Sequence, residues 1–158
     1  MIARPAKLVN PGENGPMIST VLAQQLRDAG LAWTPVGGDA FQIAGSDFEG
    51  DVFTVSDMTI EAHHYSTGTV LGFNGTTEWA LDSVALDDAL WLPREDQLRD
   101  LLRGTFERLE RTVAPDARVA YAVTTRVDGV PTSFESEDPA EAYGLALLAL
   151  IRRAAAGT

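Results

Sequence analysis

The stretch 119-VAYAVTTRVDGVPTSFESEDPAEAYGLALLALIRR-153 decides the fold of this 158-residue chain. Its first half contains two runs rich in β-branched and aromatic residues, 119–127 and 130–136, on either side of Asp128 and Gly129. An Asp-Gly pair tolerates the positive φ angles that a two-residue hairpin turn requires. The first half therefore predicts a β-hairpin.

The second half of the stretch predicts a helix that runs to about Arg153. Asp138 offers an N-cap, Pro139 suits the first helical turn, and Glu141 stands where a capping box has its acid. Residues 142–151 contain no charged side chain. A helix that is apolar all round must be covered on more than one side, so we expect it to lie between a sheet and a second layer, or to complete a homodimer.

Upstream of this stretch, alternation of apolar and polar residues predicts an antiparallel meander of about five strands over residues 41–81. A turn is expected at 66–68, and Asn74 with Gly75 predicts a second hairpin. The expected strands are 41–44, 52–56, 58–65, 69–73 and 76–81.

Two further helices are predicted from their end signals. Ser19 is an N-cap for a short helix that stops at Gly30, and Pro93 opens a second helix that stops at Gly104. Residues 105–113 fit a strand or a further helical turn equally well. The chain is thus expected to be α+β, with an antiparallel sheet, made of the meander and the later hairpin, and about three helices packed on it.

One domain is expected over residues 17–158. Residues 1–16 contain three Pro and two Gly and lack the apolar core of a secretory signal, so they predict a flexible tail. Met17, where structured sequence begins, is then the expected native start.

The charge of the chain is concentrated in one block. Residues 28–93 contain eleven acidic residues and no Lys or Arg, whereas the remainder holds twelve acidic and twelve basic residues. This distribution disfavours nucleic acid and anionic lipid, which need basic surfaces. It leaves a protein partner with a basic surface, a cation or simple solubility as alternatives. No segment approaches the ~20 apolar residues of a membrane span, and cysteine is absent, so a cytoplasmic protein is expected.

Few residues suggest chemistry. His63 and His64, the only histidines, point to opposite faces of the expected strand. Glu61 and His63 share one face with Tyr65, but two ligands fall short of the three or four that zinc needs. Lys7, the only lysine, lies outside any phosphate-binding motif.

Other candidates are equally weak. Asp47, Glu49 and Asp51 alternate as in a calcium loop, but the later Gly and Glu of that loop are missing. Residues 80–88, with Asp82, Asp87 and Asp88, are typical of a polar connection. Trp79 and Trp91 are expected in the core, the latter as an anchor where the second helix begins. We therefore assign no catalytic, cofactor-binding or metal-binding residue.

The run FNGTTEWALDS (73–83), continued by ALWLPREDQLRDLL (89–102), resembles a family of short, acidic, Lys-poor actinobacterial proteins labelled pilus assembly protein CpaE. The likeness extends over about residues 17–153. The larger namesake of that label has a receiver-like part and a MinD-like ATPase part, which this sequence lacks. Residues 92–98 and 138–142 show a looser similarity to small phage-encoded α+β proteins. These resemblances imply a compact domain and transfer no site residue.

The leading functional expectation is a non-enzymatic domain that acts through protein contacts, as an accessory to pilus assembly. One alternative is an enzyme that binds a small ligand or a metal on the acidic sheet with Glu61, His63, Tyr65 and nearby loop acids. Another is an adaptor whose sheet edge accepts a peptide strand. The sequence does not decide which strand forms that edge.

Overall fold

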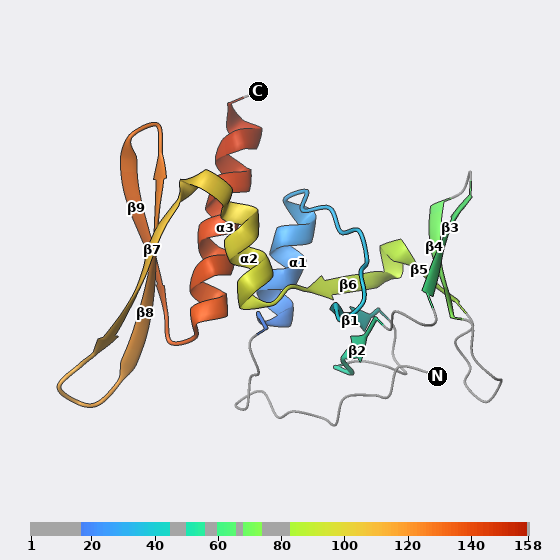
Figure 1. Ribbon diagram of the computed structural model, residues 1–158, viewed down its shortest axis with the longest axis horizontal. Coiled ribbons are helices and arrows are strands. Elements are labelled where there is room, and N and C mark those ends of the chain that lie inside the picture. Colours follow the sequence, from blue (N-terminus) through green and yellow to red (C-terminus); the bar gives the residue numbers. More distant parts are fainter. Residues whose placement is uncertain (1–16, 45–49, 56–59, 66–67, 74–82, 158) are drawn as a thin grey trace. The chain divides into compact units, whose positions relative to one another are not determined.

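Figure 1 shows the chain in a computed structural model that describes residues 17–44, 50–55, 60–65, 68–73 and 83–157. The α+β class is confirmed. The described residues form three α-helices and three antiparallel sheets of three strands each. The expected tail, residues 1–16, lies outside the described residues.

The contacts within the chain group it into two compact units, which we describe separately. The first unit comprises residues 33–92, and the second comprises residues 17–32 with 93–157. The single domain expected over residues 17–158 stays a prediction beside this grouping. Residues 33–92 hold ten acidic residues and no Lys or Arg. The charged block of the sequence therefore belongs almost entirely to the first unit.

The first unit contains two sheets instead of the single meander expected over residues 41–81. One sheet has the order β2-β1-β6 and the other the order β3-β4-β5. Phe41 of β1 pairs with Trp91 of β6, so the whole second sheet separates the two partners in sequence. The elements are β1 (Ala40–Ile43), β2 (Phe53–Thr54), β3 (Ile60–Tyr65), β4 (Gly68–Phe73), β5 (Ser83–Ala85), the 3-10 helix η1 (Leu86–Asp88) and β6 (Ala89–Leu92).

The two hairpins expected in this unit have different outcomes. β3 and β4 pair antiparallel with Tyr65 opposite Gly68, which confirms the pairing expected across 66–68. β4 also pairs with β5, so a strand lies within the segment that was expected to be a polar connection. The Asn-Gly turn and the strand expected at 76–81 fall outside the described residues.

Aromatic side chains form much of the core of the first unit. Phe41 is buried, and its ring centroid lies 5.7 Å from that of Trp33 and 5.7 Å from that of Phe53. Trp91 stacks on Trp33 with their ring centroids 6.2 Å apart. Trp91 therefore contributes to the core, as expected, and it does so from strand β6, which ends at Leu92 shortly before α2 begins.

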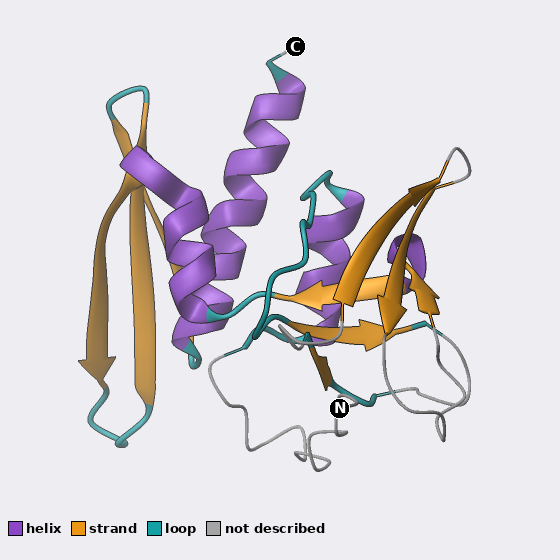
Figure 2. Cartoon of the chain, turned by 45° about the vertical axis from the view of Figure 1, so that its right-hand side comes forward, coloured by secondary structure: helices purple, strands orange, loops and turns teal. Residues whose placement is uncertain are grey.

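In the second unit, α3 lies between a three-stranded sheet and the other helices (Figures 1 and 2). It contacts β8 and β9, and it also contacts α1 and α2. The expectation that the apolar helix is buried between a sheet and a second layer is confirmed. The elements are α1 (Thr20–Asp28), α2 (Glu95–Leu102), the 3-10 helix η2 (Arg103–Thr105), β7 (Phe106–Val113), β8 (Val119–Val127), β9 (Val130–Ser136) and α3 (Pro139–Ala156).

The helices α1 and α3 approach closely at Gly144, where a Cβ atom would lie 2.6 Å from Leu22 Cδ2. Ser19 caps α1 as predicted, because its Oγ accepts the N–H of Leu22 at 3.3 Å. The Glu141 carboxylate accepts the N–H of Ser19. The capping box expected from Glu141 is therefore wrong: the acid serves the N-terminus of α1, where unpaired N–H groups and the helix dipole favour a negative charge.

The predicted N-cap of α3 is confirmed. Asp138 Oδ1 accepts the N–H of Ala140 at 2.7 Å and that of Glu141 at 3.3 Å. The N–H of Asp138 itself donates to Ser136 Oγ at 3.2 Å, which leaves the Glu141 side chain available to α1.

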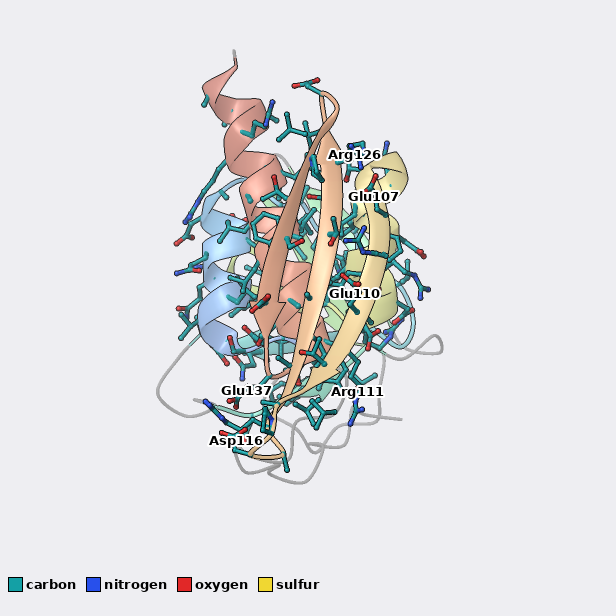
Figure 3. The ribbon with its side chains drawn as sticks, turned by 90° about the vertical axis from the view of Figure 1, so that its left-hand side faces the viewer. Glu107, Glu110, Arg111, Asp116, Arg126 and Glu137 are labelled. Carbon is teal, nitrogen blue, oxygen red and sulfur yellow. The ribbon has the colours of Figure 1, made fainter. Side chains whose placement is uncertain are left out.

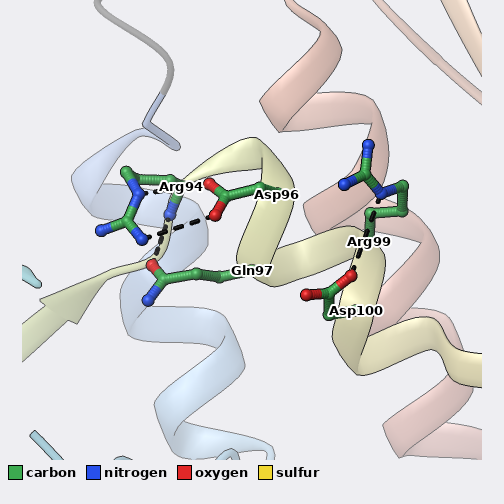
Figure 4. Close-up of polar contacts among 5 residues, drawn as sticks. All are labelled: Arg94, Asp96, Gln97, Arg99 and Asp100. Atoms are coloured by element: carbon green, nitrogen blue, oxygen red, sulfur yellow. Dashed lines mark hydrogen bonds and ion pairs between the residues drawn. The ribbon is translucent and has the colours of Figure 1, made fainter. Parts of the chain in front are cut away.

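Figure 4 shows the N-terminus of α2, where the N–H of Arg94 donates to Gln97 Oε1 at 3.0 Å and Arg94 Nε contacts Asp96 Oδ1 at 3.2 Å. Partial burial raises the pKa of Asp96, but the hydrogen bond and charge of Arg94 outweigh it and leave that pKa lowered. At the other end of α2, Arg103 adopts a φ of 51°. The predicted stop at Gly104 is thus one residue late.

Candidate functional site

Residues 105–113, which fitted two alternatives, include strand β7, and the sheet of the second unit has the order β7-β8-β9. The Asp-Gly hairpin is confirmed, with φ angles of 51° at Asp128 and 79° at Gly129. One face of the sheet packs on α3, as shown by the rings of Phe106 and Tyr143, whose centroids lie 5.5 Å apart. Burial, followed by the charge of Glu95, raises the pKa of Tyr143.

The opposite face of this sheet, which we call the outer face, has small side chains along its centre and charged ones on both flanks. Thr124 in the centre is almost fully buried, and its Oγ1 lies 2.8 Å from Ser133 Oγ. Strand alternation and the observed register assign these residues to the outer face: Arg108, Glu110 and Thr112 of β7, Ala120, Ala122, Thr124 and Arg126 of β8, and Pro131, Ser133 and Glu135 of β9.

A bulge between Phe106 and Arg108 places Glu107 beside Arg126 at one end of the outer face (Figure 3). The Arg126 guanidinium binds the Glu107 carboxylate and also donates to the Gly129 carbonyl at 2.9 Å. The hydrogen bond from Arg126, helped by its charge, lowers the pKa of Glu107 although slight burial opposes this, and the same pair raises the pKa of Arg126. The bulge and this ion pair lie at the beginning of β7 and mark where its regular pairing starts.

The two outer strands of the sheet differ in what they offer to a partner. In β7, the N–H of Ala114 donates to the Arg118 carbonyl at 2.8 Å. Antiparallel strands alternate between hydrogen-bonded and non-hydrogen-bonded pairs. The residues of β7 that lie an even number of positions from Ala114 therefore also form hydrogen bonds to β8. It follows that the main-chain N–H and C=O groups of Leu109, Arg111 and Val113 point away from β8, toward what we call the β7 edge.

The other edge of the sheet is interrupted. Val127 and Val130 flank the two-residue turn and form a hydrogen-bonded pair, so the groups of Pro131, Ser133 and Glu135 point outward from β9. Pro131 has no N–H to donate, and proline is typical of strand edges that do not accept a further strand. Among the described strands of this sheet, β7 is therefore the one whose edge has a complete set of donors and acceptors.

The side chains of β7 are largely exposed. Six of its eight residues are exposed, including Val113 at 55%. Arg108 and Glu110, both on the outer face, form an ion pair at 3.0 Å with side chains 55% and 53% exposed. An exposed ion pair of this kind contributes at most about 1 kcal/mol to folding. Its members are consequently available to charges on a partner.

The residues that sequence analysis considered for a ligand lie in the first unit. Glu61, His63 and Tyr65 belong to β3, where their main chains pair with Gly72, Val70 and Gly68 of β4. Within the residues that the structure describes, no group of three or more His or acidic residues is placed to hold a metal ion.

The loop acids have separate positions. Asp47, Glu49 and Asp82 fall outside the described residues, and so does Trp79. Asp87 and Asp88 are exposed on η1, and the main-chain carbonyl of Asp88 accepts the N–H of Ala44 at 2.8 Å. Asp51 lies just before β2 and is half-buried.

One buried acid was missed. Asp39 is 1% exposed, and its Oδ2 accepts the Trp33 indole N–H at 2.9 Å and the Val36 N–H at 3.0 Å. The preceding Pro35, Gly37 and Gly38 were a signal for the tight turn that these bonds hold together. Two donors satisfy Oδ2, so the carboxylate is a structural acceptor that holds this turn and the Trp33 ring in place.

The β7 edge was also missed, because residues 105–113 did not favour one element. A usable signal was the Pro115-Asp116 pair, which is typical of a turn and lies between two strand-like runs. In the structure, Asp116 Oδ1 accepts the N–H of Arg118 at 3.2 Å, and Ala117 adopts a φ of 64°. The turn connects β7 to β8.

None of the described helices combines the length and apolar character that a membrane crossing requires. Comparison of the chain with known protein families, with curated proteins and with solved structures finds no match.

Proposed function

We propose that this chain is a protein-binding module that takes an extended segment of its partner as an additional strand on the β7 edge. The observation that carries the proposal is the regular outward set of main-chain groups at Leu109, Arg111 and Val113, on a strand whose side chains are mostly exposed. Strand addition of this kind draws affinity from main-chain hydrogen bonds and specificity from alternate side chains.

The side chains of β7 favour a partner segment of mixed charge. Arg108 and Glu110 lie on the outer face, whereas Leu109 lies on the face that packs on α3. A segment added to β7 would place alternate residues beside the Arg108 and Glu110 charges and the others beside Leu109. We therefore expect a segment that alternates charged and apolar residues.

This proposal selects among the expectations from the sequence. It keeps a role in protein contacts and makes the peptide-binding adaptor its specific form, because the outward main-chain groups of β7 support strand addition at that edge. The accessory role in pilus assembly and the basic partner stay predictions that strand addition is compatible with. A ligand-binding role for Glu61, His63 and Tyr65 stays a prediction.

The experiment uses a proline as a block. Arg111→Pro removes an N–H that points out of the β7 edge and leaves the hydrogen bonds between β7 and β8 in place. Glu135→Pro, the matched control, removes an outward N–H from β9. The probe is a displayed library of linear peptides, selected on the full chain held at a low concentration.

Selected peptides should bind the wild type and Glu135→Pro with similar affinity, and Arg111→Pro should weaken binding by at least about tenfold, a loss of about 1.4 kcal/mol. Amide hydrogen exchange at Leu109, Arg111 and Val113 should slow when a peptide is bound. Peptides that bind Arg111→Pro as well as the wild type, or a selection that enriches no peptide, would overturn the proposal.

A further inference from the structure

We infer that the partner strand on the β7 edge is β7 of a second copy of this chain, related to the first by a two-fold axis through Leu109. The inference rests on the proposed function, because it uses the same edge. What carries it is the order of charges along the strand, Arg108-Leu109-Glu110, which is complementary to itself when reversed. A two-fold axis presents the same patch from both copies, so a strand on the axis must be self-complementary.

The geometry of an antiparallel pair sets the register. With Leu109 on the axis, its outward N–H and C=O bond reciprocally to those of Leu109 in the other copy. Arg108 then lies directly opposite Glu110 of the second copy, and Glu110 opposite Arg108. These are non-hydrogen-bonded pairs, in which opposing side chains lie closest. Both members are on the outer face, so the opposite charges meet on one side of the joined sheet.

Other positions of the axis are less favourable. An axis through Arg108, Glu110 or Arg111 places that residue opposite its own copy, so that like charges face each other. Like charges directly opposite each other in neighbouring strands are destabilising. An axis through Thr112 avoids this repulsion but forms no opposite-charge pair. Leu109 is the position within 108–112 that forms two attractive pairs without a repulsive one.

The ion pair within one copy does not compete with this arrangement. Arg108 and Glu110 already contact each other at 3.0 Å on the same face. Bringing two such pairs together creates a four-charge cluster of alternating sign, in which each carboxylate has two guanidinium neighbours. Such networks contribute more than isolated exposed pairs.

The bulge limits the length of the contact. It lies between Phe106 and Arg108, so regular pairing extends for one residue on each side of Leu109, and Arg111 lies opposite Glu107 at the bulge of the second copy. The result is a continuous six-stranded sheet joined by a short seam, since each copy contributes a three-stranded sheet. A contact this small is well below the standard interface of about 1,600 Å². We therefore expect a weak, reversible dimer.

The test is sedimentation equilibrium of the full chain at protein concentrations up to about 500 µM, a range that detects weak dimers. The wild type should show a concentration-dependent dimer. Arg108→Glu and Glu110→Arg should each weaken association by at least about tenfold, because each places like charges opposite one another twice per dimer. The double variant Arg108→Glu/Glu110→Arg restores opposite charges and should recover the association of the wild type.

Two proline variants test whether the dimer forms through the β7 edge. Arg111→Pro should weaken the dimer, because it removes an outward N–H at the end of the seam, and Glu135→Pro should leave it unchanged. Circular dichroism of both variants checks that they are folded. A dimer that is as strong in Arg111→Pro as in the wild type, or that survives both single charge reversals, would overturn the inference, as would a double variant that stays monomeric.

The failure of this inference is distinguishable from failure of the proposed function. A wild type that is monomeric throughout, but whose selected peptides are lost in Arg111→Pro, overturns the second copy as partner and leaves strand addition standing. A dimer that follows the charge pattern supports both.

Discussion

Replacing Gly144 with alanine tests how closely α1 packs on α3. The added Cβ atom would lie 2.6 Å from Leu22 Cδ2 and 3.3 Å from both Leu22 Cγ and Ile18 Cγ2. Ordinary carbon contacts are about 3.5–4.0 Å, so Leu22 must move. Leu22 is only 3% exposed, which leaves its side chain little free space. The substitution therefore overpacks the interface between the two helices.

The magnitude follows from two opposing effects. Overpacking a buried contact costs about 1–3 kcal/mol. Alanine in place of glycine inside a helix stabilises it by about 1 kcal/mol. We expect Gly144→Ala to lower the free energy of unfolding by about 1 kcal/mol, the balance of these two terms.

The decisive comparison is made in a Leu22→Ala background. Leu22→Ala alone should cost about 2–5 kcal/mol, because it leaves a cavity. It also removes the Cγ and Cδ atoms that obstruct position 144. In that background, Gly144→Ala should raise the free energy of unfolding by up to about 1 kcal/mol, since only the 3.3 Å approach to Ile18 Cγ2 still opposes the helix-propensity gain. The two positions are then coupled by up to about 2 kcal/mol.

The assay is urea denaturation followed by far-ultraviolet circular dichroism. The three α-helices that the structure describes lie in the second unit, whereas all three Trp lie in residues 33–92. Circular dichroism therefore reports on the unit that carries the substitution, and tryptophan fluorescence on the other unit. Equal effects of Gly144→Ala in both backgrounds would refute close packing of the helices at this position.

For three other substitutions, the structure predicts whether the free energy of unfolding rises or falls. Arg103→Gly should raise the free energy of unfolding by about 1 kcal/mol, because the φ of 51° at this residue strains any side chain; an unchanged urea midpoint would contradict this. Asp39→Ala should lower the free energy of unfolding by about 2–4 kcal/mol, because the Trp33 indole and one main-chain N–H lose their acceptor. Asp39→Asn keeps an oxygen acceptor there and should lower the free energy of unfolding by less. Urea denaturation followed by tryptophan fluorescence measures both effects. Glu107→Gln should lower the free energy of unfolding at neutral pH and leave it unchanged in acid. Arg126 lowers the pKa of Glu107 in the folded chain. The resulting stabilisation is therefore present above the ordinary Glu pKa and is lost as the pH falls through the lowered pKa of Glu107. A difference in urea midpoint between wild type and Glu107→Gln that grows toward low pH would contradict this assignment.

Several elements could be predicted because their signals are local. The Asp128-Gly129 turn, the Ser19 and Asp138 caps and the apolar length of α3 each depend on residues a few positions apart. A cap is made by a side chain and the N–H groups of the next turn, and a two-residue hairpin requires positive φ at both of its central residues. These interactions form wherever the residues occur, so the sequence indicates them directly.

Strand partners were harder to predict. Sequence analysis placed residues 41–81 in one meander, but β1 pairs with β6 and not with β3. Which strand lies beside another depends on the apolar surface that the pairing buries, and here the large side chains of Phe41 and Trp91 lie opposite each other. The sequence around either residue contains no signal that identifies the other as its partner. The turn signals between them therefore predicted the wrong neighbouring strands.

For the candidate site, the sequence predicted the type of interaction but not its position. Edge pairing was an expectation, but the edge itself depends on which strands the fold leaves at the side of the sheet and on which N–H groups point outward. The order of the sheet and the alternation of its hydrogen bonds set both of these at β7. The charges of Arg108 and Glu110 are visible in the sequence, yet they lie on one face because that segment is a strand and not a helix.

By itself, the sequence determined the α+β class, the caps, the late hairpin with its apolar helix, and a block of negative charge without a single Lys or Arg. The tertiary structure decided that this block belongs almost entirely to one compact unit, that Glu141 serves α1, and that β7 presents the open edge of the other unit. The physical reason is one of range: capping and turn formation involve neighbouring residues, whereas strand pairing and helix packing are decided by surfaces that are brought together only when the chain folds.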